Sequence, residues 1–260
     1  MIVKESSVKY LFRFMAVGAL VLGVAASAHA QTEVSLLVPN PFRRSLNTLI
    51  EGFESQTGDK LNVTYGGGLG TRRQVSRGEI FDVSILLPPY PEALASGNID
   101  PESATTLASL TLALGVKKGA SKPDISTPEA LRQTLLAAET IAVVDPSIGS
   151  DGFATREALQ KLGVTDLIDS KITLGRFARV TGDLVVTGEA DLCIFYFNEM
   201  GNPGLDAVGL LPKEFATPVK VVAFISTHVR DARAARALID YLSSPAAQAL
   251  YEKDGLEPAR

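Results

Sequence analysis

Three short loops carry the residues whose types and spacing could do chemistry. They span residues 39–42, 66–71 and 147–152, are rich in Gly, Pro, Asn and Ser, and each follows an apolar strand pattern. A helical pattern follows each loop, so free backbone N–H groups are expected at the positive end of a helix dipole. Ligands bind at such loops in parallel α/β sheets. Together the three loops predict a site for a small anion.

The glycine-rich loop, within "TYGGGLGTRRQ", has several interpretations. A Walker-type phosphate loop requires Gly-Lys-Ser/Thr after its glycines, and Gly70-Thr71-Arg72 does not provide this. A dinucleotide fingerprint is nominally possible, but G-x-G alone is a weak signal. The remaining alternatives are capture of an anion by backbone N–H groups and a turn selected only for positive φ. We favour anion capture because the loop lies between a strand pattern and a helix pattern.

Arginines at the starts of two predicted helices suggest a carboxylate ligand. Arg43, Arg44 and Arg72 lie in first turns, where the helix dipole disfavours a cation by about 0.3–1 kcal/mol. A guanidinium can bind a carboxylate in bidentate fashion. The alternative is that these side chains point into solvent. Arg179 is a further candidate of the same kind.

Asp151 is an unusual residue for an anion site. A carboxylate beside an anion repels it unless the carboxylate is protonated, paired with an arginine or facing a ligand hydroxyl. The alternative role of Asp151 is to cap a helix that begins near Phe153.

The elements that position these loops follow from hydrophobic periodicity. Strand patterns cover residues 33–38, 60–65, 81–87, 111–118, 139–145, 190–197 and 218–226. A helix is predicted behind Asn40 as N-cap and Pro41 as first residue, and others at 72–76, 153–163 and, interrupted at Pro245, in the tail. Strands that alternate with helices predict parallel α/β sheets.

Residues 1–30 have the pattern of a secretory signal peptide. A basic start and an apolar run from Phe14 lead to Ala28-His29-Ala30, an A-x-A cleavage site. A retained anchor is the alternative, and no later segment suits a membrane span. The sequence therefore predicts export to the periplasm.

Charge and composition narrow the function classes. Removal of residues 1–30 leaves 22 basic and 28 acidic residues, a net charge of −6, which disfavours a nucleic-acid partner. Cys193, the only cysteine, lies in "LCIFYF" and is expected to be a packed thiol. After cleavage His228 is the only histidine, and no hydrolase motif is present. We expect no cofactor and no metal.

Three segments carry a resemblance to a known family. Through "AVVDPSIGSDGFATREALQKLG" (142–163), "RRQVSRGEIFDVSIL" (72–86) and "GEADLCIFY" (188–196), the chain resembles the periplasmic molybdate-binding proteins, solute receptors of ABC importers. The likeness runs from Glu33 to Ala259.

The resemblance implies an α/β, two-lobed periplasmic binding protein fold of type II, which encloses its ligand by hinge closure. It places two crossover strands near 111–116 and 218–223. Lobe 1 would comprise 31–110 with 222–260, and lobe 2 would comprise 111–221.

The resemblance also implies which residues bind the ligand. Two family serines fall at Pro41 and Gly68, which have no hydroxyl. Main-chain donors fall at Ser150, Asp151 and Ala178, and a phenol donor at Tyr196. The complete predicted ligand-binding set is Asn40, Pro41, Phe42, Arg43, Gly67, Gly68, Leu69, Arg72, Ser150, Asp151, Ala178, Arg179 and Tyr196.

The missing hydroxyls and added arginines shift the expected ligand from molybdate or tungstate towards a di- or tricarboxylate. The sequence thus predicts a monomeric periplasmic receptor, not an enzyme, that delivers a small anion to the membrane permease of an ABC importer. The alternatives are an exported hydrolase and a receptor that serves a sensor.

Overall fold

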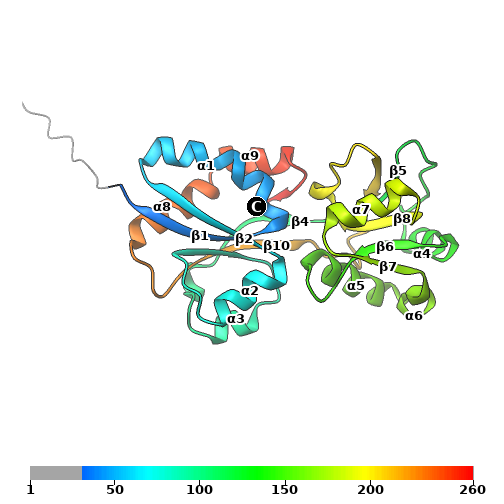
Figure 1. Cartoon of the computed structure of the whole chain (residues 1–260), viewed down its shortest axis with the longest axis horizontal. Coiled ribbons are helices and arrows are strands. Elements are labelled where there is room, and N and C mark those ends of the chain that lie inside the picture. The colour runs from blue at the N-terminus through cyan, green and yellow to red at the C-terminus, as the bar shows by residue number, and fades with distance from the viewer. Residues whose placement is uncertain (1–30, 260) are drawn as a thin grey trace, which may run out of the picture. The chain divides into compact units, whose positions relative to one another are not determined.

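The computed structural model describes residues 31–259, so the predicted signal peptide and its cleavage site lie outside the described residues. The described chain forms two α/β sheets (Figure 1). The first has the strand order β11-β4-β10-β3-β1-β2, and the second has the order β7-β6-β8-β5-β9. The strands are β1 Glu33–Pro39, β2 Lys60–Gly66, β3 Val83–Leu86, β4 Thr105–Leu110, β5 Leu112–Lys117, β6 Ile141–Val144, β7 Ile172–Gly175, β8 Leu192–Tyr196, β9 Leu205–Leu210, β10 Val219–Ile225 and β11 Glu257–Pro258.

Both sheets are mixed, so the prediction of parallel sheets is wrong for several strands. In the first sheet β1 runs parallel to β2 and β3, but β10 runs antiparallel to β3 and β4. In the second sheet β6 runs parallel to β7 and β8, but β5 runs antiparallel to β8 and β9. Parallel neighbours need a crossover connection, usually a helix. Strands β5 and β10 enter their sheets directly from the other sheet, without such a helix.

The chain passes between the two sheets twice. It leaves the first sheet at Thr111, between β4 and β5, and returns over residues 211–218, between β9 and β10. We propose that these passages separate the lobes. The predicted boundaries, 31–110 plus 222–260 and 111–221, assign Val219–Val221 to the second lobe, whereas these residues pair with β4 in the first sheet.

Helices cover both faces of each sheet. In Figure 1, α1, α8 and α9 lie on one side of the first sheet, and α2 and α3 lie on the other. In the second sheet α7 and α5 pack on opposite faces. The helices are α1 Arg43–Thr57, α2 Gly68–Ser76, α3 Pro91–Ala95, α4 Pro128–Ala137, α5 Ser150–Leu162, α6 Thr165–Ile168, α7 Ala178–Thr187, α8 Ala232–Leu242 and α9 Pro245–Lys253, and the 3-10 turns used below are η1 Asn40–Phe42 and η4 Phe197–Glu199. Within residues 31–259 no helix has the length and apolarity needed to cross a bilayer.

Two helix starts differ from the prediction. Asn40 is not an N-cap: it begins the 3-10 turn η1, and its Oδ1 accepts a hydrogen bond from Arg43 Nη2 at 3.0 Å. Helix α2 begins at Gly68, inside the glycine loop, rather than at Arg72. Glycine N–H groups therefore form the first turn of α2, where they have no partner inside the helix.

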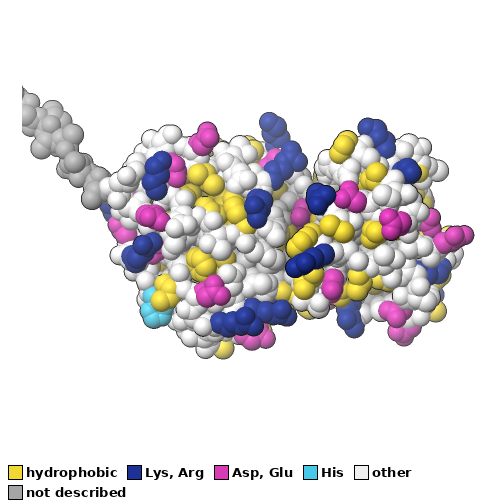
Figure 2. All heavy atoms as spheres, in the orientation of Figure 1, with side chains coloured by type: hydrophobic (Ala, Val, Ile, Leu, Met, Phe, Trp, Pro, Cys, Tyr) yellow, Lys and Arg dark blue, Asp and Glu magenta, His cyan; other side chains and the backbone are white. Residues whose placement is uncertain are grey.

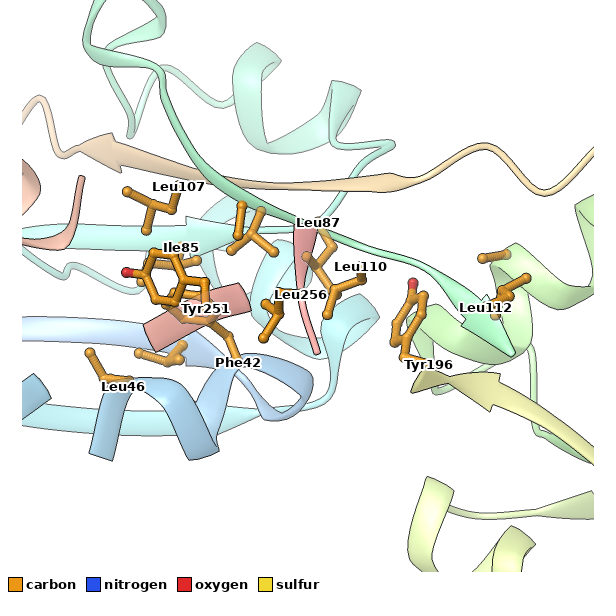
Figure 3. Close-up of a cluster of buried hydrophobic side chains, with 14 of the residues drawn as sticks. Phe42, Leu46, Ile85, Leu87, Leu107, Leu110, Leu112, Tyr196, Tyr251 and Leu256 are labelled. Atoms are coloured by element: carbon orange, nitrogen blue, oxygen red, sulfur yellow. The ribbon is translucent and has the colours of Figure 1, made fainter. Parts of the chain in front are cut away.

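Strand periodicity divides the side chains of β8 between two cores. Ile194 and Tyr196 belong to the cluster on the α5 side, whereas Cys193 and Phe195 belong to the cluster with α7. The packed thiol predicted at Cys193 is confirmed, and burial raises the pKa of this thiol to about 12. Figure 3 shows Tyr196 at the end of the core, beside β5. The phenol thus lies at the carboxyl end of β8.

A buried acid joins the strands of the first sheet. Asp82 accepts hydrogen bonds from the Ser35 backbone N–H at 2.8 Å and from the Ser35 hydroxyl at 2.7 Å. Arg230 Nη2 donates to the same carboxylate at 2.6 Å. Burial favours the neutral acid, but the hydrogen bonds from Arg230 and Ser35 outweigh it and hold the pKa of Asp82 well below its usual range.

Candidate functional site

The glycine loop and the loop before α5 meet face to face. A Cβ atom at Gly67 would lie 3.1 Å from the Ile148 carbonyl oxygen. A Cβ atom at Gly68 would lie 2.5 Å from Ser150 Oγ and 2.6 Å from Ser150 Cβ. Only glycine fits so close an approach of one backbone to the other lobe. Two of the three predicted anion loops therefore share one contact between the sheets.

The third loop reaches the same region through its carbonyl. Asn198 Nδ2, in the turn η4 after β8, donates to the Pro41 carbonyl oxygen at 2.7 Å. Nearby, a Cβ atom at Gly255 would lie 3.0 Å from the Phe197 ring. Pro41 thus contributes an acceptor to the contact between the lobes, and it has neither a hydroxyl nor an N–H to give to an anion.

Helix α5 directs its N-terminus at this contact. Gly149 is its N-cap and Ser150 its first residue. A side chain at Gly152 would overlap the Val144 carbonyl, so the first turn is pressed directly against β6. Asp151 is the second helical residue, and the alternative that it caps a helix near Phe153 is wrong because α5 begins before Asp151.

Four buried polar atoms at this contact have no hydrogen-bond partner. They are Ser150 Oγ, Tyr196 Oη, Asn198 Oδ1 and Glu199 Oε2, among the described residues. A buried polar group without a partner costs roughly 1–3 kcal/mol, and such groups are rare in native proteins. Their concentration at one place indicates a site that a polar ligand completes.

Two carboxyl groups at the site favour their neutral forms. Burial raises the pKa of Asp151 to about 6, although its own N–H and that of Gly152 favour the charged form. Burial also raises the pKa of Glu199 well above its usual range, and the charge of Asp151 raises it further. Because like charges cannot both be buried cheaply, ionisation of one carboxyl group disfavours ionisation of the other.

Tyr196 is a neutral hydrogen-bond donor. Burial, followed by the charge of Asp151, raises the pKa of its phenol well above the ordinary value. The nearby Ser150 hydroxyl favours the ionised phenol, but neither oxygen has a hydrogen-bond partner.

Arg72 brings a positive charge from the first lobe to this contact. Its Cζ lies 6.0 Å from the centre of the Phe153 ring, on α5. Burial lowers the pKa of Arg72, whereas the negative charge of Glu92 raises it. Figure 2 shows basic side chains gathered over the α2 region, next to the second lobe. A hollow of about 380 Å³ beside the contact includes Leu69, Arg72 and Phe153 in its walls.

The other predicted residues around η1 have different roles. Phe42 is fully buried and packs on Tyr251, with ring centres 5.2 Å apart, so its side chain belongs to the core, and a contact of Phe42 with the ligand stays a prediction. Arg43 stacks on the Tyr65 ring at 3.8 Å. Arg44 forms an ion pair with Asp254 at 3.5 Å. The two arginine side chains thus interact with aromatic and acidic neighbours in the same lobe. The sequence pattern does not reveal these partners.

Ala178 and Arg179 lie at the start of α7. Ala178 is the first helical residue, and it shares a hollow of about 420 Å³ with Glu199. Arg179 lines the same hollow, but its side chain is 81% exposed and pairs with Asp183 at 3.2 Å.

The sequence prediction missed Asn198 and Glu199. Both follow directly after the apolar strand β8, at its carboxyl end. The same rule that selected the three loops, a polar segment after a buried strand, would have found them.

A larger hollow lies elsewhere. It has a volume of about 690 Å³ and is lined by residues of β5, α4 and β8, including Lys117, Gln133 and Asp191. No buried polar atom without a partner belongs to its lining. We therefore place the site at the contact between the loops.

Comparison with known proteins agrees with this architecture. The family of bacterial extracellular solute-binding proteins matches residues 34–257. The chain is 29% identical to an aconitate isomerase of a Pseudomonas species over 94% of this chain and 95% of that protein. It is 28% identical to a molybdate-binding protein of Azotobacter vinelandii over 91% of this chain and 94% of that protein.

A solved structure shares the fold. The substrate-binding domain of a putative molybdenum ABC transporter from Clostridium difficile aligns with a TM-score of 0.74 at 17% identity, over 88% of this chain and 100% of that domain. The expected two-lobed periplasmic binding protein fold is confirmed.

Proposed function

Because the chain belongs to the bacterial extracellular solute-binding proteins, we propose that it captures a small organic polycarboxylate between its two lobes. The proposal includes export by a signal peptide at residues 1–30, a periplasmic location and delivery of the ligand to the permease of an ABC importer. The names of the molybdate-binding relatives support an anion receptor. The monomeric state stays a prediction.

The donor set favours carboxylates over a tetrahedral oxyanion. Pro41 and Gly68 supply no hydroxyl. An ionised Asp151 or Glu199 repels a compact dianion, whereas the neutral acid donates a hydrogen bond to a carboxylate. A guanidinium such as that of Arg72 matches a carboxylate in bidentate geometry. The relative named aconitate isomerase supports this class as well, since aconitate is a tricarboxylate.

One observation carries the proposal: four unpartnered buried oxygens lie where loops of both lobes meet. A hinge-closing receptor needs its ligand to bond to both walls at once. The first wall offers the N–H groups at the start of α2 and the charge of Arg72. The second wall offers the α5 N-terminus, the Ser150 hydroxyl and the Tyr196 phenol.

The test is a thermal-shift screen of the purified protein against molybdate, tungstate, sulfate, phosphate and a panel of di- and tricarboxylates. We expect tricarballylate, citrate or aconitate to raise the unfolding temperature more than molybdate does. Stabilisation by molybdate alone would refute the carboxylate assignment.

Arg72→Ala provides a matched test of the first wall. Loss of a charge-assisted hydrogen bond is expected to weaken polycarboxylate binding roughly ten- to a hundredfold by calorimetry. Arg77→Ala removes the same charge from the exposed end of α2 and should leave affinity unchanged. Equal losses in both variants would indicate a general charge effect instead of a contact.

The two alternative functions, a hydrolase and a receptor that serves a sensor, require different residues at the site. A hydrolase that uses Cys193 as nucleophile is disfavoured, because the thiol is buried and its pKa is raised to about 12. A receptor that serves a sensor uses the same binding site, and the ligand screen applies to it equally.

A further inference from the structure

We propose that the second lobe holds a second binding site, a hollow between α5, α6 and β7 that takes an apolar α-amino acid. The hollow has a volume of about 320 Å³. Within residues 31–259 it shares no lining residue with the hollows beside Arg72 and beside Glu199. The inference does not depend on the proposed function, because the polycarboxylate would bind at the contact between the lobes.

Two threonine hydroxyls in the lining have no hydrogen-bond partner among the described residues. Thr155, on α5, is 1% exposed, and Thr165 is the first residue of α6. The Oγ1 atom of each is buried and unpaired. By contrast, the hydroxyls of Thr57 and Thr181, also on helices, donate to the carbonyl four residues earlier at 2.9 and 3.0 Å. Because buried polar groups without partners are rare, two in one lining indicate a polar ligand.

Four aliphatic side chains give the same hollow an apolar surface. Val143 of β6 and Leu174 of β7 are register partners, and Ile172 lies two residues before Leu174 on the same face of the sheet. Leu159 lies on α5, one turn after Thr155. Leu174 is 54% exposed although its side chain is large and apolar. An aliphatic ligand side chain would cover this surface.

A basic and an acidic side chain also line the hollow. Arg156 follows Thr155 on α5, and Asp169 begins the 3-10 turn η3 Asp169–Lys171. Both residues are exposed, which places them at the mouth of the hollow. No ion pair within residues 31–259 includes either of them. A guanidinium binds a carboxylate and a carboxylate binds an ammonium, and an α-amino acid carries both groups on one carbon.

The hydroxyls, the aliphatic side chains and the two opposite charges together select the ligand class. A monocarboxylate leaves Asp169 unpaired, and an amine leaves Arg156 unpaired. A hydrocarbon satisfies neither hydroxyl. One water does not fill the hollow, because a water occupies roughly 30 Å³ in the liquid. The volume lies at the lower end of the range for small-molecule sites, roughly 300–1,000 Å³, which suits an amino acid such as leucine.

Calorimetric titration of the purified protein with L-leucine tests the inference. We expect saturable binding at one site. Two analogues each lack one charged group: 4-methylpentanoate has no ammonium, and 3-methylbutylamine has no carboxylate. Each should bind roughly ten- to a hundredfold more weakly than leucine, because one charge-assisted hydrogen bond is lost. Saturating tricarballylate should leave the affinity for leucine unchanged.

Two charge variants test the mouth of the hollow. Arg156→Gln should weaken leucine binding at least about tenfold and leave the weak binding of 3-methylbutylamine unchanged. Asp169→Asn should weaken leucine binding similarly and leave that of 4-methylpentanoate unchanged. Lys161→Gln on α5 and Asp166→Asn on α6 are the matched controls, because both residues are exposed and neither lines the hollow. Both controls should bind leucine as the wild type does.

A neutral variant tests the buried hydroxyl. Thr155→Val replaces a hydroxyl without a partner by a methyl group of similar shape. The unfolding temperature of the ligand-free protein should stay unchanged or rise, and leucine binding should weaken about tenfold. Thr57→Val, in the first lobe, removes a hydroxyl that has a partner. It should lower the unfolding temperature and leave the affinity for leucine unchanged.

Three results would overturn the inference. The first is the absence of saturable leucine binding by the wild-type protein. The second is binding at another place, shown by displacement of leucine by tricarballylate or by an Arg156→Gln variant that loses no more affinity than Lys161→Gln. The third is equal affinity for leucine and 4-methylpentanoate, which would exclude a role of Asp169 and with it the amino-acid class. Each of these results leaves the proposed capture of a polycarboxylate standing.

Discussion

Two buried aspartates show that the effect of burial on the pKa of a carboxyl group depends on the groups around it. Asp82, 3% exposed, lies among donors from Ser35 and Arg230, and its pKa is held below the usual range. Asp151, 5% exposed, has no basic partner among residues 31–259, and burial raises its pKa to about 6. The first acid is part of the scaffold. The second is buried without a cationic partner and destabilises the fold, which is typical of residues at functional sites.

The sharpest contrast is expected in stability. Asp82→Asn replaces an acceptor oxygen by an amide that faces the Ser35 and Arg230 donors. Loss of hydrogen bonds to a charged group is expected to lower the free energy of unfolding by about 2–3 kcal/mol. Asp151→Asn removes a buried unpaired acid and should leave that free energy unchanged or raise it. Urea unfolding of both variants at pH 7 measures the difference, and an equal loss in both would remove the distinction between the sites.

The two acids also predict opposite pH dependence. The ordinary pKa of an aspartate is 3.8, and the folded-state pKa of Asp151 is about 6. From pH 4 to 6 the folded protein keeps a proton on Asp151 that the unfolded chain has released. This contribution to stability is therefore complete below pH 4 and is lost as the pH rises, about 2–3 kcal/mol in all. The contribution of Asp82 is present above pH 4 and is lost as the pH falls.

Urea unfolding between pH 4 and pH 7 tests this sign. The loss of stability with rising pH should be smaller in Asp151→Asn than in the wild type, although the coupled Glu199 contributes to the remaining slope. An unchanged slope in the variant would mean that Asp151 does not hold the proton.

Two tyrosines give the smallest and most selective comparison. Tyr251 Oη donates to the Leu242 carbonyl at 2.8 Å, whereas Tyr196 Oη has no partner. Tyr251→Phe should cost about 1 kcal/mol of stability and no affinity. Tyr196→Phe should retain stability and weaken tricarballylate binding about tenfold. Calorimetry with a parallel melting curve measures both, and a reversed pattern would assign the phenols the opposite roles.

The sequence could predict the features that depend on residues close together in the chain. The loops at Gly67–Gly68 and Ser150–Asp151 follow from strand and helix periodicity, and both lie at the contact between the lobes. Tyr196 came from the resemblance. The antiparallel courses of β5 and β10 depend on how the chain passes between sheets, which local periodicity does not encode.

Contacts between residues far apart in the sequence could not be predicted either. The Asp82–Arg230 pair joins residues 148 positions apart, and no local pattern links them. The proximity of Glu199 to Asp151 likewise requires β8 and α5 to be packed together. Without that packing, Asp151 could be considered only as a cap or as a possible contact for the ligand.

A crystal structure grown with tricarballylate tests the central claim most directly. We predict one molecule bound between the lobes, in contact with the Gly68 N–H and Arg72 on one side and with Ser150 and Tyr196 on the other. A ligand bound elsewhere, or held by one lobe alone, would contradict the account.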